Sequence, residues 1–431
     1  MLISLIPFFI LGYFLFFLKN NRLNNLLTGL IFVSFFVFAT NYTSFGFEFN
    51  IFRYLHRIIG SLIAITIVFH VFKYRINVFK ELMPRMLALF FLALLLSFIG
   101  NDIYVEYYVR YVRNFIFISF IVLYLYYMLD SNEKLEELMS LIVAITLILS
   151  CFIVLEIVQN GWGHKAELFY PNRNYLAYSL LPGFIWSFHS KSKYKWLSLC
   201  LIAFAIFLTT SRAVELSVVF SIFLYVFFRQ YKLVYVTSGS IVAIAILVLF
   251  FDQIVLNQNF SNIRYVLAKI SVNAFQENPI NGMGYGQFKK NYSNYIDQDI
   301  IKMKNEEINE KIHINRPDFP NIDKYLQELP KENRDYIMNF GEKEQMTHND
   351  LLTVVAELGL LGIACTVFLF YKLYIELQKL ILHNREYFYL SISLIGGSLI
   401  FSLLHNNLTT FVFWFVIFIP FIMNRNYEKT T

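Results

Sequence analysis

Two arginines and one histidine have side chains suited to the chemistry of phosphate-linked substrates. Arg212 follows the stretch FLTTS, Arg264 lies in the run IRYVLAKISVNAF, and His348 follows Met-Thr just before a long apolar run. A guanidinium fork binds phosphate oxygens bidentately, and a neutral imidazole accepts a proton near neutral pH. Brought together, the three side chains would hold a phosphate group and take a proton from an attacking hydroxyl.

The position of His348 favours an uncharged base. Thr347, with Asp350 three residues later, resembles a capping box with Asp in place of Glu, which predicts a helix start here. The backbone donors and the macrodipole at a helix N-terminus disfavour a cation, and nearby guanidinium groups act in the same direction. The same helix end favours a bound anion.

Each of the three residues also has a simpler interpretation. An arginine such as Arg212 at a membrane boundary is typical of a snorkelling anchor. Arg264 fits a solvated or salt-bridged helix residue, and His348 fits a helix cap or a packing residue. His405 and Asn406 form a second His-Asn pair, so the composition of the pair alone does not identify a catalytic base.

Two further motifs leave alternatives open. The stretch FYPNRNYLA (169–177), with Asn172 and Asn174, fits either a substrate loop or an Asx-type turn before a helix. The stretch GMGYG (282–286) lacks the Gly-Lys-Ser/Thr end of a phosphate-binding loop, which favours a plain turn.

The elements that must position these residues are predicted to be membrane helices. The chain of 431 residues is 57% hydrophobic and 15% charged, whereas soluble domains carry about 25% charged residues. The apolar runs are continuous and lack the short alternating pattern of a membrane β-barrel. We therefore expect an all-α polytopic membrane protein with about 12–13 transmembrane helices and one large external loop that forms a partly helical cap.

Thirteen apolar runs are long enough to be candidate spans, and twelve is the alternative if the first run or one of the last two lies differently. The predicted spans are 2–18, 23–40, 57–72, 85–100, 114–129, 138–158, 174–189, 196–210, 213–228, 233–251, 350–371, 389–405 and 408–423. They divide the chain into residues 1–251 with about ten spans, the large loop 252–347, and residues 348–431 with about three spans.

Lysine and arginine predict the orientation of the spans. They concentrate in one alternating set of connections, which the positive-inside rule assigns to the cytoplasm: 19–22, 73–85, 130–137, 191–195, 229–232, 372–388 and the tail after 423. The other connections and the large loop then face the periplasm or the cell exterior, and this side holds all three candidate residues. The net charge of +6 is spread over the loops and does not indicate a nucleic-acid partner.

Four motifs follow one another between Phe169 and Gly362. They are FYPNRNYLAYSLLPGF, TTSRAVELSVVF, NIRYVLAKISVNAFQENPINGMGYGQF and THNDLLTVVAELGLLG. This ordered set, with a large outer loop between spans, resembles the O-antigen ligase and Wzy-type polysaccharide polymerase family. The first 168 residues share with the family only their hydrophobic spans. The family often has about twelve spans with the N-terminus inside, whereas thirteen spans place this N-terminus outside.

The resemblance implies roles for the three candidate residues. Arg212 and Arg264 would hold the pyrophosphate of an undecaprenyl-diphosphate-linked glycan. His348 would act as the base or would position the acceptor hydroxyl. The resemblance also implies a reaction without nucleotide sugars, metal ions or other cofactors, and the sequence has no His/Cys cluster with metal-ligand spacing.

Supporting roles follow from the same resemblance. Asn172, Asn174 and Asn349 lie in family-like motifs and would assist substrate binding. Glu357, Gly359 and Gly362 are expected to pack the span that begins near residue 350, since glycines permit close helix approach.

The resemblance implies a glycosyltransferase in the bacterial inner membrane with its site on the outer side. We expect a polymerase of lipid-linked repeat units; the alternatives are an O-antigen ligase with lipid A-core as acceptor and an enzyme of protein O-glycosylation. Expected partners are membrane lipid, a chain-length regulator and a flippase of the same pathway. A transporter of lipid-linked glycans and a structural scaffold are the rivals from other classes, although few ionisable residues lie inside the spans, which disfavours ion-coupled transport.

Overall fold

The computed structural model describes most of the chain from residue 80 onward. The described residues are 65, 71, 80–101, 104–162, 164–166, 168, 172–190, 192–230, 258–296, 347–408 and 410–430. The predicted spans 2–18, 23–40 and 233–251, nearly all of 57–72, and much of the large loop lie outside the described residues.

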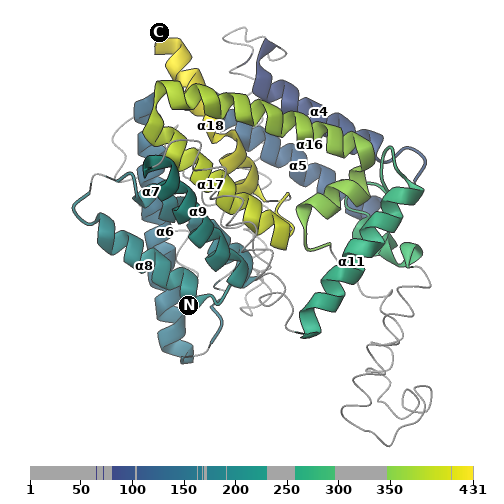
Figure 1. Cartoon of the computed structure of the whole chain (residues 1–431), viewed down its shortest axis with the longest axis horizontal. Coiled ribbons are helices and arrows are strands. Elements are labelled where there is room, and N and C mark those ends of the chain that lie inside the picture. The colour runs from purple at the N-terminus through teal and green to yellow at the C-terminus, as the bar shows by residue number, and fades with distance from the viewer. Residues whose placement is uncertain are drawn as a thin grey trace, which may run out of the picture. The chain divides into compact units, whose positions relative to one another are not determined.

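Each predicted span after residue 80, apart from 233–251, corresponds to a helix (Figure 1). These helices are α4 (Leu82–Leu96), α5 (Val105–Met128), α6 (Asn132–Asn160), α7 (Arg173–Ser187), α8 (Lys195–Leu208), α9 (Arg212–Gln230), α16 (Asp350–His383), α17 (Arg385–Leu404) and α18 (Phe411–Thr430). The large loop contributes α11 (Gln258–Glu277), α12 (Phe288–Asn291) and the 3₁₀ turn η4 (Tyr292–Tyr295). The described residues contain no strand, and α5, α6, α16 and α17 are each long and apolar enough to cross a membrane. The all-α polytopic membrane fold is therefore confirmed.

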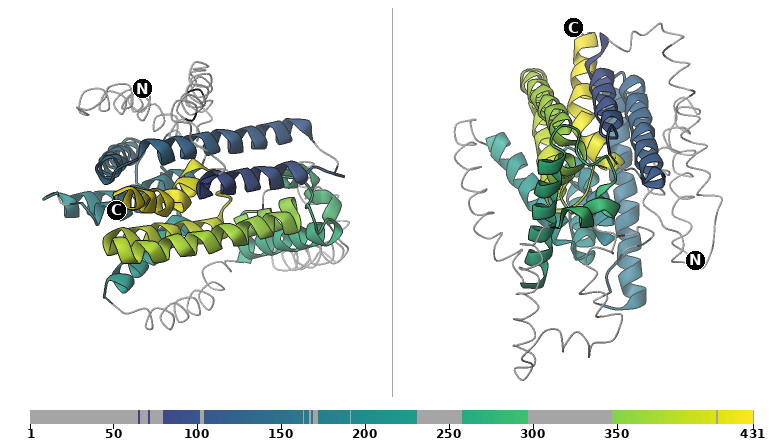
Figure 2. Two further views of the ribbon diagram at one scale, coloured as in Figure 1. Left: turned by 90° about the horizontal axis from the view of Figure 1, so that it is seen from above. Right: turned by 90° about the vertical axis from the view of Figure 1, so that its right-hand side faces the viewer.

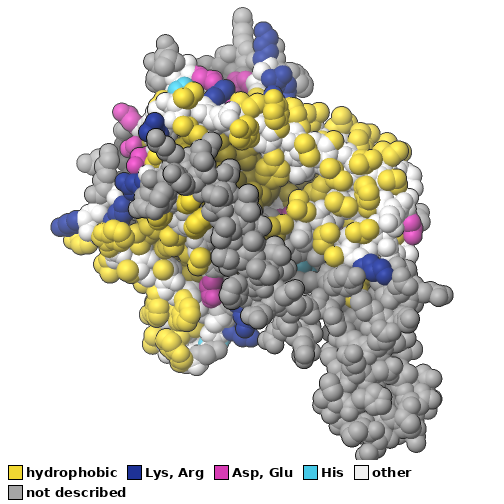
Figure 3. All heavy atoms as spheres, viewed as in Figure 1, with side chains coloured by type: hydrophobic (Ala, Val, Ile, Leu, Met, Phe, Trp, Pro, Cys, Tyr) yellow, Lys and Arg dark blue, Asp and Glu magenta, His cyan; other side chains and the backbone are white. Residues whose placement is uncertain are grey.

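Apolar side chains lie on the outside of several helices. Leu197 and Phe207 of α8 are 68% and 61% exposed, and Val367 of α16 is 63% exposed. Hydrophobic side chains cover much of the described surface in Figure 3. Soluble monomers rarely show such continuous apolar surface, so these helix faces fit contact with lipid chains.

The predicted connection 372–388 is mostly helical. Helix α16 continues to His383, and α17 begins only two residues later at Arg385. The segment contains no glycine or proline, and its buried leucines recur at helical spacing, at Leu373, Leu377 and Leu380. Asn384 separates the helices: its Oδ1 accepts hydrogen bonds from the backbone N–H groups of the second and third following residues.

The chain forms two compact units. Unit 1 comprises residues Met1–Ala88, Asn114–Gly239 and Phe368–Thr431, and unit 2 comprises Leu89–Arg113 and Ser240–Val367. Within unit 1, α6 packs against α7 and α8, and α17 packs against α7, α9 and α18. Figure 2 shows α6 as one long continuous ribbon. Each unit is described separately below.

Helices α9 and α17 approach closely through small residues. A Cβ atom added at Gly397 would lie 2.1 Å from Ser221 Oγ and 3.1 Å from the carbonyl oxygen of Ser217, and one added at Gly396 would lie 2.2 Å from a methyl carbon of Leu224. Small residues at the interface are the usual way for membrane helices to gain van der Waals contact. The pair therefore depends on both glycines, and it holds the helix that begins with Arg212.

Replacing Gly397 by Val is expected to lower the midpoint of thermal unfolding of the purified protein in detergent. The new side chain would overlap Ser221 and the α9 backbone, and overpacking of this kind costs about 1–3 kcal/mol. Leu403→Val, at a 42% exposed position of the same helix, is the control and should leave the midpoint nearly unchanged. Equal midpoints for both variants would contradict the importance of this contact.

One end of unit 1 gathers connections that the sequence assigns to the cytoplasm. Three pairs of side chains join them: Tyr387 donates to Glu136 at 3.2 Å, Arg229 lies 3.6 Å from Glu386, and Lys379 lies 3.0 Å from Glu428. The grouping of these connections at one end matches the predicted topology. The assignment of that end to the cytoplasm stays a prediction.

Candidate active site

The start of α7 carries two of the candidate residues. Asn172 has an extended backbone, and its Oδ1 accepts a hydrogen bond from the backbone N–H of Asn174 at 2.8 Å, so Asn172 caps the helix. The loop before α7 therefore ends in an Asx-type turn. Contact of Asn172 with substrate stays a prediction.

Two side-chain hydrogen bonds join the start of α7 to the start of α9. Ser211 Oγ donates to Asn174 Oδ1 at 2.7 Å, and Arg173 Nη1 donates to Thr210 Oγ1 at 2.5 Å. Arg212 is the first residue of α9, and its side chain is exposed. Asn174 thus fixes the residue next to Arg212, and the exposed guanidinium group remains accessible to a ligand.

The third partner at this end is the connection between α17 and α18. Tyr175 donates its hydroxyl hydrogen to the carbonyl oxygen of Asn406 at 2.6 Å. The imidazole of His405 stacks on Phe401 with ring centroids 5.2 Å apart. Unit 1 therefore brings the second His-Asn pair to the same end as Arg212, with His405 packed against an aromatic ring.

Left-handed backbone conformations occur just before Arg212 and at His348. Among the described residues, the non-glycine residues with positive φ are Leu168, Thr210 and His348. Thr210, at φ 53°, lies two residues before α9, and His348, at φ 52°, lies two residues before α16. A β-branched residue in this region is a genuine outlier, and such strain tends to accumulate at functional sites. The strain at Thr210 therefore marks the helix start that carries Arg212, whereas histidine adopts the left-handed region more readily.

The predicted capping box at Thr347 is wrong by two residues. Helix α16 begins at Asp350, and the cap is Asn349, whose Oδ1 accepts from the backbone N–H groups of Leu351 at 2.9 Å and Leu352 at 3.2 Å. Thr347 Oγ1 lies 2.6 Å from Thr353 Oγ1 and 2.9 Å from the carbonyl oxygen of Asn349, to which it donates. The left-handed conformation of His348 prevents the helix from starting earlier. Asn349 therefore has a clear structural role, and its contact with substrate stays a prediction.

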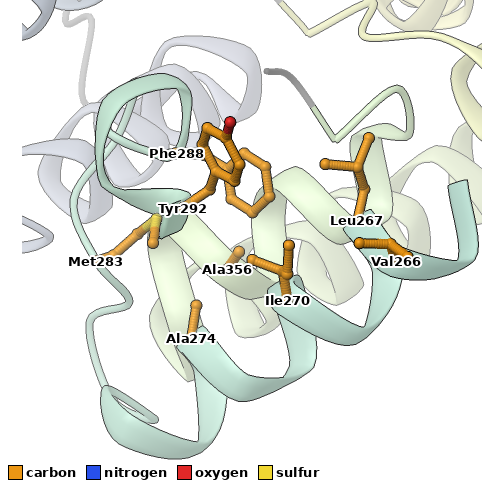
Figure 4. Close-up of a cluster of buried hydrophobic side chains, with 8 residues drawn as sticks. All are labelled: Val266, Leu267, Ile270, Ala274, Met283, Phe288, Tyr292 and Ala356. Atoms are coloured by element: carbon orange, nitrogen blue, oxygen red, sulfur yellow. The ribbon is translucent and has the colours of Figure 1, made fainter. Parts of the chain in front are cut away.

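Arg264 lies on α11, which ends at Asn278-Pro279 as the sequence predicts. The following residues of α11 turn one apolar face toward a buried cluster in unit 2 (Figure 4). The cluster comprises Val266, Leu267, Ile270 and Ala274 of α11, Met283, Phe288, Tyr292, and Ala356 of α16. This cluster fixes α11 against the first part of α16, which begins directly after His348 and Asn349.

Helix α16 is interrupted at Gly359, where φ is 58° and ψ is −150°. The glycine-rich loop after α11 occupies the interruption. The N–H groups of Met283 and Gly284 donate to the carbonyls of Ala356 and Glu357 at 2.9 and 3.1 Å. In return, the N–H groups of residues 360 and 361 donate to the carbonyls of Pro279 and Ile280 at 2.8 and 3.1 Å. The loop thus supplies the hydrogen bonds that the interrupted helix lacks.

Glu357 completes this joint. Its side chain is 5% exposed, and its two carboxylate oxygens accept hydrogen bonds from the N–H groups of Gly286 at 2.8 Å and Phe288 at 3.0 Å. We call the contact between Glu357 and these two backbone groups the Glu357 latch. Gly359 permits a close approach as the sequence predicts, but the approach is that of the loop, at a point where the regular helix is interrupted, and Glu357 binds the same loop. The sequence offered one signal for this contact: a carboxylate in an apolar run must find hydrogen-bond donors when it is buried.

Comparison with known proteins bears on the segment that carries both arginines. Residues 197–313, which include Arg212 and Arg264, match the family model described as O-antigen ligase. This match to part of the chain supports the predicted resemblance to the O-antigen ligase/polymerase family. A search of curated proteins found no match to this chain. The family assignment indicates a membrane glycosyltransferase of the ligase or polymerase type that acts on lipid-linked glycans.

The predicted site residues fall into two sets, one in each unit. Unit 1 brings Asn172, Asn174 and Arg212 to one end through the α7–α9 contacts. Unit 2 joins α11, which bears Arg264, to the part of α16 that follows His348. Convergence of the two sets in a single site stays a prediction.

Proposed function

We propose that the chain polymerises oligosaccharide repeat units carried on undecaprenyl diphosphate. It would transfer the growing glycan from one lipid diphosphate to a sugar hydroxyl of another lipid-linked repeat unit. The observation that carries this proposal is the O-antigen ligase match over residues 197–313, which contains both predicted phosphate-binding arginines. The reaction would take place on the outer side of the bacterial inner membrane.

The proposed reaction is a direct displacement at the anomeric carbon. The bond between that carbon and the diphosphate oxygen breaks, and the electron pair leaves with the diphosphate. The acceptor hydroxyl oxygen forms the new bond from the opposite face, which inverts the anomeric centre, and its proton passes to His348. Arg212 and Arg264 would stabilise the charge that develops on the leaving diphosphate. The exposed guanidinium group of Arg212 at a helix start supports this assignment.

Transfer to lipid A-core is the second candidate, because the matching family model is described as O-antigen ligase. The two reactions share the donor and the proposed chemistry and differ in the acceptor. A transporter remains the rival from another class, and it would need no displacement.

Deletion of the gene in its own host distinguishes these functions by the banding of surface glycan. A polymerase deletion leaves one repeat unit attached and removes the long chains. A ligase deletion leaves undecorated core and accumulates lipid-linked polymer. The purified protein in detergent, given lipid-linked repeat units extracted from the deletion strain and no ion gradient, should form polymer. Failure to form product both from repeat units alone and after addition of lipid A-core would contradict glycan transfer and favour transport.

A further inference from the structure

The Glu357 latch joins the two elements of unit 2 that carry or adjoin the candidate catalytic residues Arg264 and His348. Helix α11, which bears Arg264, leads directly through Asn278-Pro279 into the glycine-rich loop. That loop binds α16 at its interruption, and the part of α16 before the interruption begins two residues after His348. Any shift of the loop on α16 would therefore change the position of α11 relative to the helix start that follows His348.

The glycine-rich loop and α16 touch backbone to backbone at Gly282 and Gly359, where no larger side chain would fit. Gly282 has a φ of +67°, and a Cβ atom added there would lie 2.4 Å from the carbonyl carbon of Glu357. A Cβ atom added at Gly359 would lie 2.6 Å from the backbone nitrogen of Gly282. The two backbones are in direct contact, so the loop and α16 fit together in one register.

The side chain of Glu357 also holds the loop in this register on α16. Both of its oxygens accept, and the two donors are backbone N–H groups of the segment that follows the glycines. An amide in the same place offers one acceptor and one N–H₂ group. The N–H₂ group would face a backbone donor, and one buried N–H group would lose its partner.

We propose that Glu357 is a positioning residue of glycan transfer, which holds the helix of Arg264 and the helix start at His348 in their reactive arrangement. The inference rests on the proposed function and adds to it a residue that touches neither substrate nor reacting atoms. Glu357 acts through the loop backbone, and its loss displaces the catalytic groups without removing them.

The test is Glu357→Gln, assayed in detergent with lipid-linked repeat units extracted from the deletion strain. We expect kcat to fall about 10–100-fold, because displacements of about 1 Å have effects of this size. The KM for the lipid-linked donor should change less than kcat, because Arg212, which does not depend on the Glu357 latch, still binds the diphosphate. A kcat within about twofold of the wild-type value would overturn the proposal. If the wild-type protein itself forms no product, the proposed function fails and this role fails with it.

Glu376→Gln is the matched control. Glu376 lies on the same helix, is 6% exposed, and accepts a hydrogen bond from Asn424 Nδ2 at 2.8 Å. It belongs to unit 1 and lies at the end of α16 away from His348. The control also loses a buried carboxylate of α16, one that pairs with Lys379 at 3.1 Å and does not touch the glycine-rich loop, so it should retain the wild-type kcat. An equal loss in both variants would show that any buried carboxylate of α16 is required for folding, and it would overturn the positioning role.

A double variant separates positioning from a loss of folded protein. If Glu357 acts through the placement of His348, Glu357→Gln should lower the residual rate of a His348→Ala protein by less than about twofold. A smaller population of folded protein would instead lower the rate by the same factor in both backgrounds. Additive losses in both a His348→Ala and an Arg264→Ala protein would therefore overturn the proposal.

Gly282→Ala disturbs the same joint from the loop side. We expect a loss of kcat similar to that of Glu357→Gln, because the added Cβ atom overlaps the α16 backbone. Gly161→Ala is its control, since Gly161 also has a positive φ, +92°, but no atom lies within 4 Å of the added Cβ atom. Wild-type kcat in a folded Gly282→Ala protein would contradict the proposal independently of Glu357.

Discussion

Replacing His348 by Ala is expected to lower the rate of glycan transfer by about 10²–10⁴-fold, the usual contribution of a general base. The imidazole stands just before the start of α16. The acceptor hydroxyl would then have to lose its proton to water. The measurement is the rate of polymer formation from extracted lipid-linked repeat units, and the KM for the donor should change little.

Two further variants make the result specific to the imidazole. His348→Asn keeps a residue that tolerates the left-handed backbone, so a loss equal to that of His348→Ala would exclude a backbone effect. His405→Ala removes the other histidine of a His-Asn pair, which stacks on Phe401, and it should keep the wild-type rate. A fully active His348→Ala protein would rule out His348 as the base.

Replacing Arg212 by Ala is expected to lower the transfer rate by about 10²–10³-fold, the effect of removing one donor that stabilises developing charge. The guanidinium group is exposed at the first residue of α9, where backbone N–H groups also favour an anion. Arg212→Lys keeps the charge but loses the bidentate geometry, so it should restore only part of the rate. Single-turnover rates with the extracted donor would measure both effects.

Arg229→Ala provides the control for charge on the same helix. Arg229 lies near the other end of α9, 3.6 Å from Glu386, and an exposed ion pair of this kind contributes at most about 1 kcal/mol to stability. The variant should transfer glycan at the wild-type rate. If Arg229→Ala and Arg212→Ala lose activity equally, the effect of Arg212 is not specific to the donor diphosphate.

The spans after residue 80 could be predicted from the sequence because continuous apolar runs leave few choices in lipid. The helix starts at Arg173 and Arg212 lie within one residue of their predicted positions. The pairing of Glu136 with Tyr387 and of Tyr175 with Asn406 agrees with the alternating topology that lysine and arginine predict. Spans and topology depend on the hydrophobicity and charge of each segment, and both can be read from the sequence of that segment alone.

The joint between the glycine-rich loop and α16 could not be predicted in the same way. Gly359 and Glu357 lie in an apolar run that is long enough for one straight helix, and the interruption depends on backbone partners some 75 residues earlier in the chain. The cap at Asn349 was misplaced for a related reason, since a positive φ at His348 leaves no mark in residue types. Backbone contacts between segments that are far apart in the chain cannot be predicted from hydrophobic and charge patterns.

The interruption at Gly359 also has a consequence for where the acceptor is bound. The regular part of α16 from Leu360 to His383 is about 36 Å long at 1.5 Å per residue, which suffices to cross a hydrocarbon layer of about 30 Å. The turns before the interruption are therefore not needed for anchoring and can stand in the headgroup layer. Under the proposed function, the sugar of the substrate would meet His348 in the headgroup layer while the isoprenoid tail of its carrier stays among the lipid chains, so neither half of the substrate would have to leave its own solvent.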